Sequence, residues 1–108
     1  MYNLKIGRHN YIVNYVEQHH EALDGSYKGR CYSEQKKIFV AIELPETEQE
    51  LVLIHEAFHA ILYTSGGYEY LIEKGLTRDN IETLIKIMEH TLTDFVYDNY
   101  KEINDLRR

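Results

Sequence analysis

Residues 55–59 read His-Glu-Ala-Phe-His, and this spacing requires a helix if both histidines are to contact one partner. On an α-helix, positions i and i+4 lie on the same face, so the imidazoles of His55 and His59 can reach a single metal ion. Glu56 lies about 100° further round the helix, where its carboxylate can reach a metal-bound water rather than the metal. The pentapeptide therefore predicts a helix with two metal ligands, His55 and His59, and a general base, Glu56.

The flanking sequence predicts where this helix begins and ends. Thr47 and Glu50 have the spacing of a capping box, in which each side chain bonds the backbone amide of the other residue. Ser65-Gly66-Gly67 is a typical helix end. Between these signals, apolar residues recur at helical spacing at Leu51, Ile54, Phe58, Ile61 and Leu62. The pentapeptide is therefore expected in the middle of an amphipathic helix.

The first half of the chain has the alternating pattern of β-strands. Strands are predicted over residues 2–6 and 10–16, with a turn at residues 24–26. The clearest strand covers residues 37–44 and ends at Pro45. Its alternate residues on one face are Ile38, Val40, Ile42 and Leu44. The strands all precede the helix that carries the two histidines.

A second and longer helix is predicted from residue 79 to residue 103. Its apolar stripe consists of Ile81, Leu84, Ile85, Met88, Leu92, Phe95 and Val96. Strands followed by two helices predict the α+β class, with a small antiparallel sheet packed on the motif helix and the long C-terminal helix. No linker or repeat divides the chain, so residues 1–108 are expected to form a single zincin-like domain.

Composition argues against several classes of partner. Lysine and arginine total 12 against 18 aspartates and glutamates, a net charge of −6, and no basic stripe is present that would bind nucleic acid or an anionic membrane. The first residues lack the apolar segment of a secretory signal, and no apolar run is long enough to cross a bilayer. The one cysteine, Cys31, excludes an internal disulfide. We therefore expect a cytoplasmic protein that binds neither nucleic acid nor membrane.

A further ligand is needed, because a catalytic zinc needs three protein ligands and one open position. In the glutamate-type zincins, this ligand comes from a helix downstream of the motif, so the second helix is where we look for it. Glu82 and Glu89 are seven residues apart and so lie on the same side of this helix, at the flank of its apolar stripe. Glu82 follows Asp79 by three residues and can instead complete a helix cap, while Glu89 is also explained as a surface charge. His90 points away from the stripe. The third ligand is expected among these residues, with Glu82 the first candidate.

Several segments resemble the small HExxH zinc metallopeptidases of bacteriophages and prophages, which are similar in core to the ImmA/IrrE metallopeptidases. The resemblance lies in residues 36–44 (KKIFVAIEL), in residues 51–62 (LVLIHEAFHAIL) and, weakly, in residues 92–99, which end in Asp98-Asn99. It covers about the last two-thirds of the chain, and the pentapeptide with its flanks is its specific part. It implies a zincin-like fold and a bound zinc ion (Zn2+). The residue roles that it implies are metal ligation by His55, His59 and Glu82, and general base catalysis by Glu56.

The motif and the resemblance together predict a zinc-dependent peptidase. Glu56 would take a proton from zinc-bound water as this water attacks a peptide carbonyl, and then return it to the leaving amine. The partner would be a peptide or protein substrate, bound along the edge of the strand at residues 37–44.

Two other interpretations are open. In a deformylase-like site, Cys31 would join the two histidines as a ligand, although an isolated reduced cysteine in a strand is the simpler interpretation. The third interpretation is a non-catalytic, phage-type interaction protein that binds zinc without turnover. The sequence has no separate substrate-recognition domain, which favours the interaction protein, whereas a purely structural site has no use for the general base Glu56.

Overall fold

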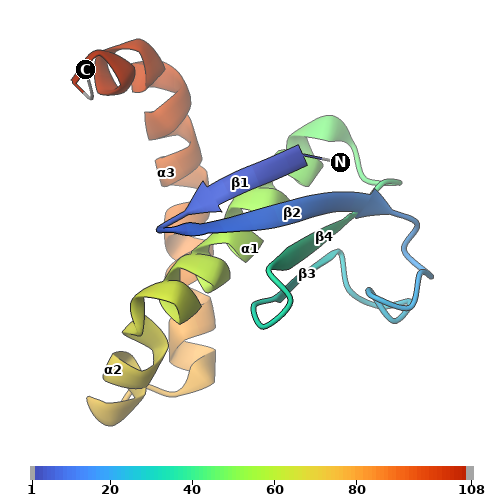
Figure 1. Ribbon diagram of the computed structural model, residues 1–108, viewed down its shortest axis with the longest axis horizontal. Coiled ribbons are helices and arrows are strands. Elements are labelled where there is room, and N and C mark those ends of the chain that lie inside the picture. The colour runs from blue at the N-terminus through green and yellow to red at the C-terminus, as the bar shows by residue number, and fades with distance from the viewer. Residues whose placement is uncertain (1, 107–108) are drawn as a thin grey trace.

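All the strands precede all the helices along the chain (Figure 1). The computed structural model describes the backbone of residues 2–106 and the side chains of residues 3–102. The strands are β1 (Tyr2–Ile6), β2 (His9–Val16), β3 (Gly29–Tyr32) and β4 (Lys37–Ala41). The helices are α1 (Glu46–Ser65), α2 (Gly67–Glu73) and α3 (Arg78–Leu106). The predicted α+β class is confirmed. Within residues 2–106, none of these helices has the length and apolarity that a membrane span requires.

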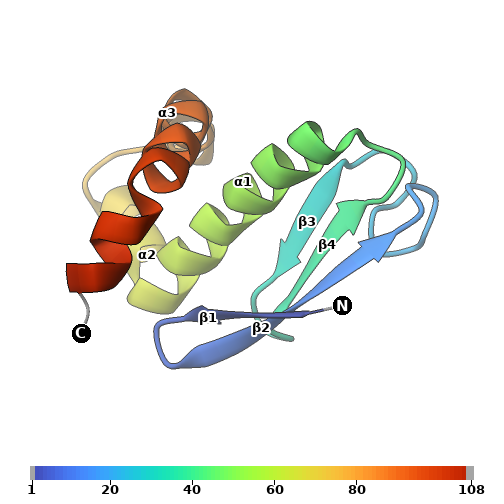
Figure 2. The ribbon, with the colours of Figure 1, turned by 90° about the horizontal axis from the view of Figure 1, so that it is seen from above.

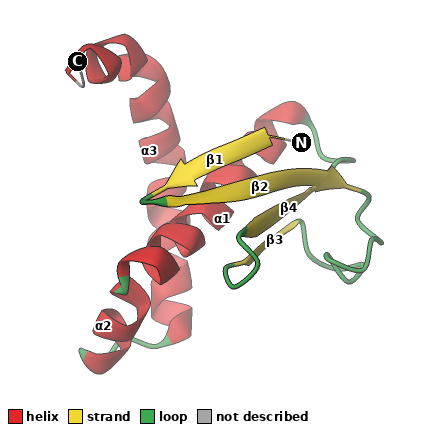
Figure 3. Ribbon diagram, in the orientation of Figure 1, coloured by secondary structure: helices red, strands yellow, loops and turns green. Residues whose placement is uncertain are grey.

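The sheet is mixed, so the prediction of an antiparallel sheet is wrong. Its order is β1-β2-β4-β3, and β2 pairs in parallel with β4, with Val13 opposite Ile38, while the outer pairs are antiparallel. The connection over residues 17–28, drawn as a loop in Figure 3, separates β2 from β3. The chain reaches β4, the parallel neighbour of β2, through this connection and β3, over residues 17–36. Parallel strands need such a long connection, and the alternation within each strand carries no information about it. As a result β4 lies inside the sheet and β3 forms an edge, so the strand expected to offer its edge to a peptide has none free.

The start of α1 differs from the predicted capping box. Pro45 occupies the N-cap position and no side chain caps the helix, because the helix begins one residue before Thr47 and places this residue within its first turn. Gln49 instead donates from Nε2 to the carbonyl oxygens of Ile42, at 3.0 Å, and Leu44, at 2.9 Å. These bonds hold the first turn of α1 to the segment that follows β4.

The predicted end of α1 is confirmed. Gly66 follows the helix with a left-handed φ of 77°, which ends the regular hydrogen bonding and turns the chain directly into α2. Tyr68, in the first turn of α2, is 8% exposed and contacts the same apolar cluster as Ile81 and Ile85 of α3. The glycine therefore brings a buried tyrosine back against the helix pair.

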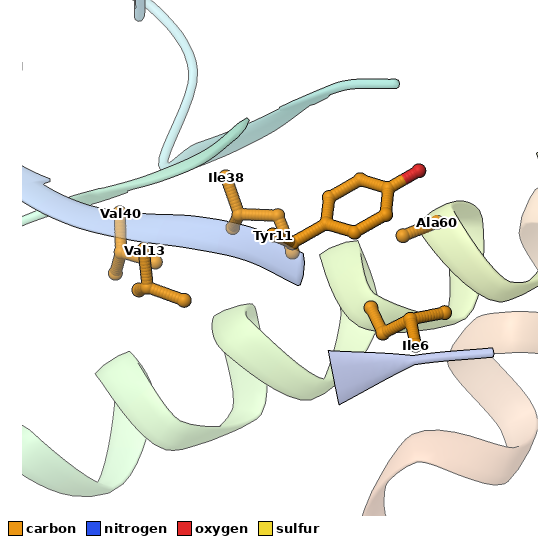
Figure 4. Close-up of a cluster of buried hydrophobic side chains, with 6 residues drawn as sticks. All are labelled: Ile6, Tyr11, Val13, Ile38, Val40 and Ala60. Atoms are coloured by element: carbon orange, nitrogen blue, oxygen red, sulfur yellow. The ribbon is translucent and has the colours of Figure 1, made fainter. Parts of the chain in front are cut away.

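Helix α1 is packed on two sides, with the sheet on one side and α3 on the other (Figure 2). The core between the sheet and α1, drawn in Figure 4, consists of Ile6, Tyr11, Val13, Ile38, Val40 and Ala60. On the other side, Phe58 and Leu62 of α1 pack against Tyr68, Ile81 and Ile85. The two long helices were expected to cover the same face of the sheet, but α3 packs on α1 instead.

The apolar stripe of α3 is buried only near the N-terminal end of the helix. Ile81 and Ile85 are 1% and 2% exposed. The other members of the stripe are 38% to 52% exposed, and they are Leu84, Met88, Leu92, Phe95 and Val96. Helical periodicity thus identified the apolar side of α3 correctly, but it overstated how much of that side the rest of the described chain covers.

A pair of isoleucines tests how β4 is packed. Ile38 is fully buried, whereas Ile42, predicted to share its face, lies beyond the end of β4 and is 52% exposed. We expect Ile38→Val to lower the free energy of unfolding by about 1 kcal/mol, because it removes a buried methyl group. Ile42→Val is the matched control and should change this value by less than about 0.5 kcal/mol. Urea denaturation measures both, and equal losses would contradict the burial of Ile38.

Candidate metal centre

The two histidines of the pentapeptide project from successive turns of α1 toward α3. Nε2 of His55 lies 2.7 Å from Oε1 of Glu82, and Nε2 of His59 lies 2.9 Å from Oε2 of the same carboxylate. Their ligand atoms all lie within 4.8 Å of one another. The side chains of the histidines are 14% and 17% exposed, and that of Glu82 is 37% exposed. This group lies close enough together to hold a metal ion.

Glu82 reaches the histidines because other residues cap α3. The amide of Asn80 donates to Oγ1 of Thr77 at 3.1 Å, and the amide of Thr77 donates to Oδ1 of Asn80 at 3.0 Å. These two residues complete a reciprocal cap, so the alternative cap role considered for Glu82 is not what the structure shows. The burial of Ile81 and Ile85 against α1 sets the rotation of α3 and turns Glu82 toward the imidazoles.

Each imidazole has a further partner on its other nitrogen. Nδ1 of His55 lies 2.7 Å from Oε2 of Glu89, and Nδ1 of His59 lies 2.5 Å from the hydroxyl of Tyr68. The side chain of Glu89 is 17% exposed, so its interpretation as a surface charge is wrong. Glu89 does not share the position of Glu82, because it contacts the opposite nitrogen of the ring. Such outer contacts orient ligating histidines and select their tautomer.

The sequence predicted the position of His90 but not that of Tyr68. His90 is exposed, as expected, and it is not part of the group that can hold a metal. Tyr68 was not anticipated as a partner of His59. It is one of ten tyrosines in the chain, and its position depends on α2 folding back after Gly66. No pattern in the sequence distinguishes it from the others.

Glu56 lies on the side of α1 that approaches β3. A side chain at Gly29 of β3 would overlap Cγ1 of Val52 and would come within 3.3 Å of Cγ of Glu56. The edge strand can therefore lie close against the helix beside Glu56 because Gly29 has no Cβ. The sequence motif places Glu56 on the helix, but this glycine lets β3 form the wall beside it.

The titration of the site follows from its burial. Burial raises the pKa of Glu56 to about 7, and the nearby charge of Glu82 adds to the rise, while His55, Arg30 and a backbone hydrogen bond from Cys31 lower it. Burial also lowers the pKa of His59 below its ordinary value of 6.5 and raises the pKa of Tyr68 to about 12. At neutral pH the neutral imidazole of His59 is therefore favoured, which is the form that binds metal.

A cleft in two parts lies beside the group formed by His55, His59 and Glu82. One part, with a volume of about 590 Å³, is lined by residues that include Tyr27, Lys28, Glu48, Lys86, Glu89 and His90. The other part, with a volume of about 470 Å³, is lined by residues that include Arg30, Tyr63, His59, Tyr68, Arg78 and Asp79. His55, Glu56 and Glu82 line both parts. A ligand in the cleft would therefore extend past Glu56 in two directions.

Comparisons of the chain with protein-family models, curated proteins and solved structures found no match. The donor atoms themselves therefore indicate what the site can bind. Two imidazole nitrogens and one carboxylate oxygen form a set that suits a catalytic metal ion, because three protein ligands leave one position open. Among the described residues the group contains no cysteine, so the structure does not favour the deformylase-like interpretation.

Cys31 offers a test of this assignment through its reactivity. Burial, and secondarily the charge of Glu56, raises the pKa of its thiol from 9.0 to about 12. Because the thiolate is the reactive form, we expect alkylation by iodoacetamide at pH 9 to be at least about tenfold slower in the folded chain than in urea. Mass spectrometry measures both rates. A folded-state rate equal to the rate in urea would show an accessible, ionised thiol and revive Cys31 as a ligand candidate.

Proposed function

We propose that the chain is a zinc-dependent metallopeptidase that hydrolyses a peptide bond. The observation that carries this proposal is the convergence of both Nε2 atoms on the carboxylate of Glu82, with Glu56 beside them in an open cleft. Peptidases of the HExxH type need this combination of two histidines, one further ligand and a neighbouring base.

The hydrogen bonds on Nδ1 support a cation between these groups. The carboxylate of Glu89 can accept a hydrogen bond from Nδ1–H of His55, and the hydroxyl oxygen of Tyr68 can accept one from Nδ1–H of His59. In neutral imidazoles both Nε2 atoms then carry lone pairs, which face the oxygens of Glu82 at 2.7 and 2.9 Å. Protonation of a ring or a bound cation relieves the repulsion between acceptors this close to one another, and imidazole with carboxylate is a donor set that suits zinc.

The number of ligands favours catalysis over a purely structural role. Structural zinc sites close with four protein ligands, commonly cysteines, whereas the group here offers three residues within the described part of the chain. The buried general base and the two-part cleft likewise have no use in a structural site. These features support the peptidase over the alternative of a non-catalytic zinc-binding interaction protein.

The reaction assigns a separate task to each side chain. When bound, zinc supplies Lewis acidity, which polarises a carbonyl group and makes water easier to deprotonate near neutral pH. His55, His59 and Glu82 would hold the ion. Glu56 accepts the proton of the attacking water and delivers it to the amine that leaves, so its carboxyl group alternates between two protonation states.

The edge strand β3 gives a peptide substrate a place to bind. The amide of Ala41 donates to the carbonyl oxygen of Lys28, the residue just before β3, at 2.8 Å. The backbone groups of Lys28 therefore face β4. By alternation, the backbone groups of Gly29 face away from β4. An extended peptide can add to this edge beside Glu56. β3 thus replaces β4 as the strand that we propose for substrate binding.

Metal content tests the proposed ligands. We expect the purified parent chain to bind one zinc ion, and Glu82→Ala to lose most of this zinc, because a carboxylate ligand is removed. Glu89→Ala should weaken affinity by about 10–100-fold but still reach one ion at saturating zinc, since it removes an orienting contact. His90→Ala, which changes an exposed neighbour, is the control. Atomic absorption after dialysis measures the content, and a parent chain without zinc would contradict the site.

Peptide cleavage tests the proposed role of Glu56. We expect Glu56→Gln to keep its zinc but to cleave peptides about 10²–10⁴-fold more slowly, because the amide cannot accept the proton of water. A proteome-derived peptide mixture analysed by mass spectrometry avoids choosing a substrate in advance. Glu73→Gln, on the exposed surface of α2, is the matched control and should cleave as the parent does. Undiminished cleavage by Glu56→Gln would refute the mechanism, and a zinc-loaded parent that cleaves nothing would favour the interaction protein.

A further inference from the structure

Two guanidinium groups line the same part of the cleft as the metal group. Arg30 comes from the edge strand β3 and Arg78 from the first turn of α3, and both line the part that also contains His59, Glu82 and Tyr68. They therefore belong to different walls of the cleft. The charge of Arg30 acts on Glu56, whose pKa it lowers, so this guanidinium lies near the general base.

Both arginines are held by aromatic rings rather than by acids. The guanidinium of Arg30 lies 4.7 Å from the ring centre of Tyr27 and 5.0 Å from that of Tyr32, and that of Arg78 lies 6.0 Å from that of Tyr68. Within the described residues neither arginine forms a salt bridge. A guanidinium that lies over a ring keeps the N–H donors at its edge available for a ligand.

The other part of the cleft provides a contrast. There, Nζ of Lys28 lies 2.6 Å from Oε1 of Glu48, so this cation already has an acidic partner. Arg30 and Arg78 thus differ from Lys28, because within the described residues they form no ion pair. Their guanidinium groups can therefore bind an anionic group of a ligand beside the metal group.

The geometry points to a subsite in which Arg30 and Arg78 bind a carboxylate group of the peptide beside the bond that is cleaved. A guanidinium binds a carboxylate through two parallel N–H···O bonds. Asp79, Glu56 and Glu82 line the same part of the cleft, so a singly charged carboxylate suits it better than a doubly charged phosphate. The carboxylate can come from an aspartate or glutamate side chain or from the C-terminus of the peptide. This inference rests on the proposed function for the bond that reacts, but binding can be measured without turnover.

The test uses zinc-loaded Glu56→Gln chain and fluorescein-labelled heptapeptides of alanine and serine. Their central residue is glutamate or glutamine, and each is made with a free or an amidated C-terminus. Fluorescence anisotropy should show binding about tenfold tighter for a peptide with a carboxylate than for the amidated glutamine peptide. The peptide that gains this affinity identifies the source as the side chain or the terminus. Equal affinities, or no binding of any peptide, would overturn the inference.

Substitutions at the arginines complete the test. Arg30→Gln and Arg78→Gln should each reduce the preference for the carboxylate peptide about fivefold or more, whereas Arg8→Gln should preserve it. Arg8 is an exposed arginine in the turn between β1 and β2, so it controls for the change in net charge. Retained zinc content and circular dichroism show that each variant is folded. An equal effect of Arg8→Gln would assign the preference to overall charge and overturn the subsite.

The outcome is separate from that of the proposed function. If the parent chain binds zinc and cleaves peptides while the arginine variants keep the full carboxylate preference, the subsite is wrong and the peptidase stands. If the parent cleaves nothing but its carboxylate preference depends on Arg30 and Arg78, the subsite stands and the peptidase is wrong.

Discussion

The position of α1 between two packing surfaces is the constraint on which the site depends. Phe58 packs toward α3, and Ala60, two residues later, packs against the sheet. Because each residue advances about 100° around a helix, a strip of α1 remains between these two contacts. His55, Glu56 and His59 occupy that strip. The same packing that buries the two sides of the helix therefore leaves these three residues free to line the cleft.

Three helices then act on the two imidazole rings. α1 supplies the rings, α3 supplies Glu82 on Nε2 and Glu89 on Nδ1 of His55, and α2 supplies Tyr68 on Nδ1 of His59. Contacts on both nitrogens restrict the rotation and the tautomer of each ring. A metal ion that meets ligands already oriented in this way costs less conformational entropy to bind. Gly66 is part of the same arrangement, since it turns α2 back toward α1.

Local patterns predicted the elements better than their partners. The first two strands, the histidine helix and its glycine end lie where periodicity and turn residues place them. The predicted capping box at Thr47 is wrong because Pro45, two residues earlier, takes the N-cap position, a difference that propensity does not resolve. Glu89 was misjudged because its helix position resembles that of many surface charges. Its burial depends on how closely α3 lies against His55.

From the chain alone, the spacing of His55, Glu56 and His59 already predicts that both histidines lie on one face of a helix with the glutamate beside them, because intrahelical geometry is local. The apolar stripe likewise places Glu82 on a second helix near the flank of its buried side. Other features were decided by the tertiary structure. They are the strand order, the close approach of Gly29 to α1, and the convergence of Glu82, Glu89 and Tyr68 on the two imidazole rings. They depend on long-range packing among the sheet and three helices, which a local pattern does not encode.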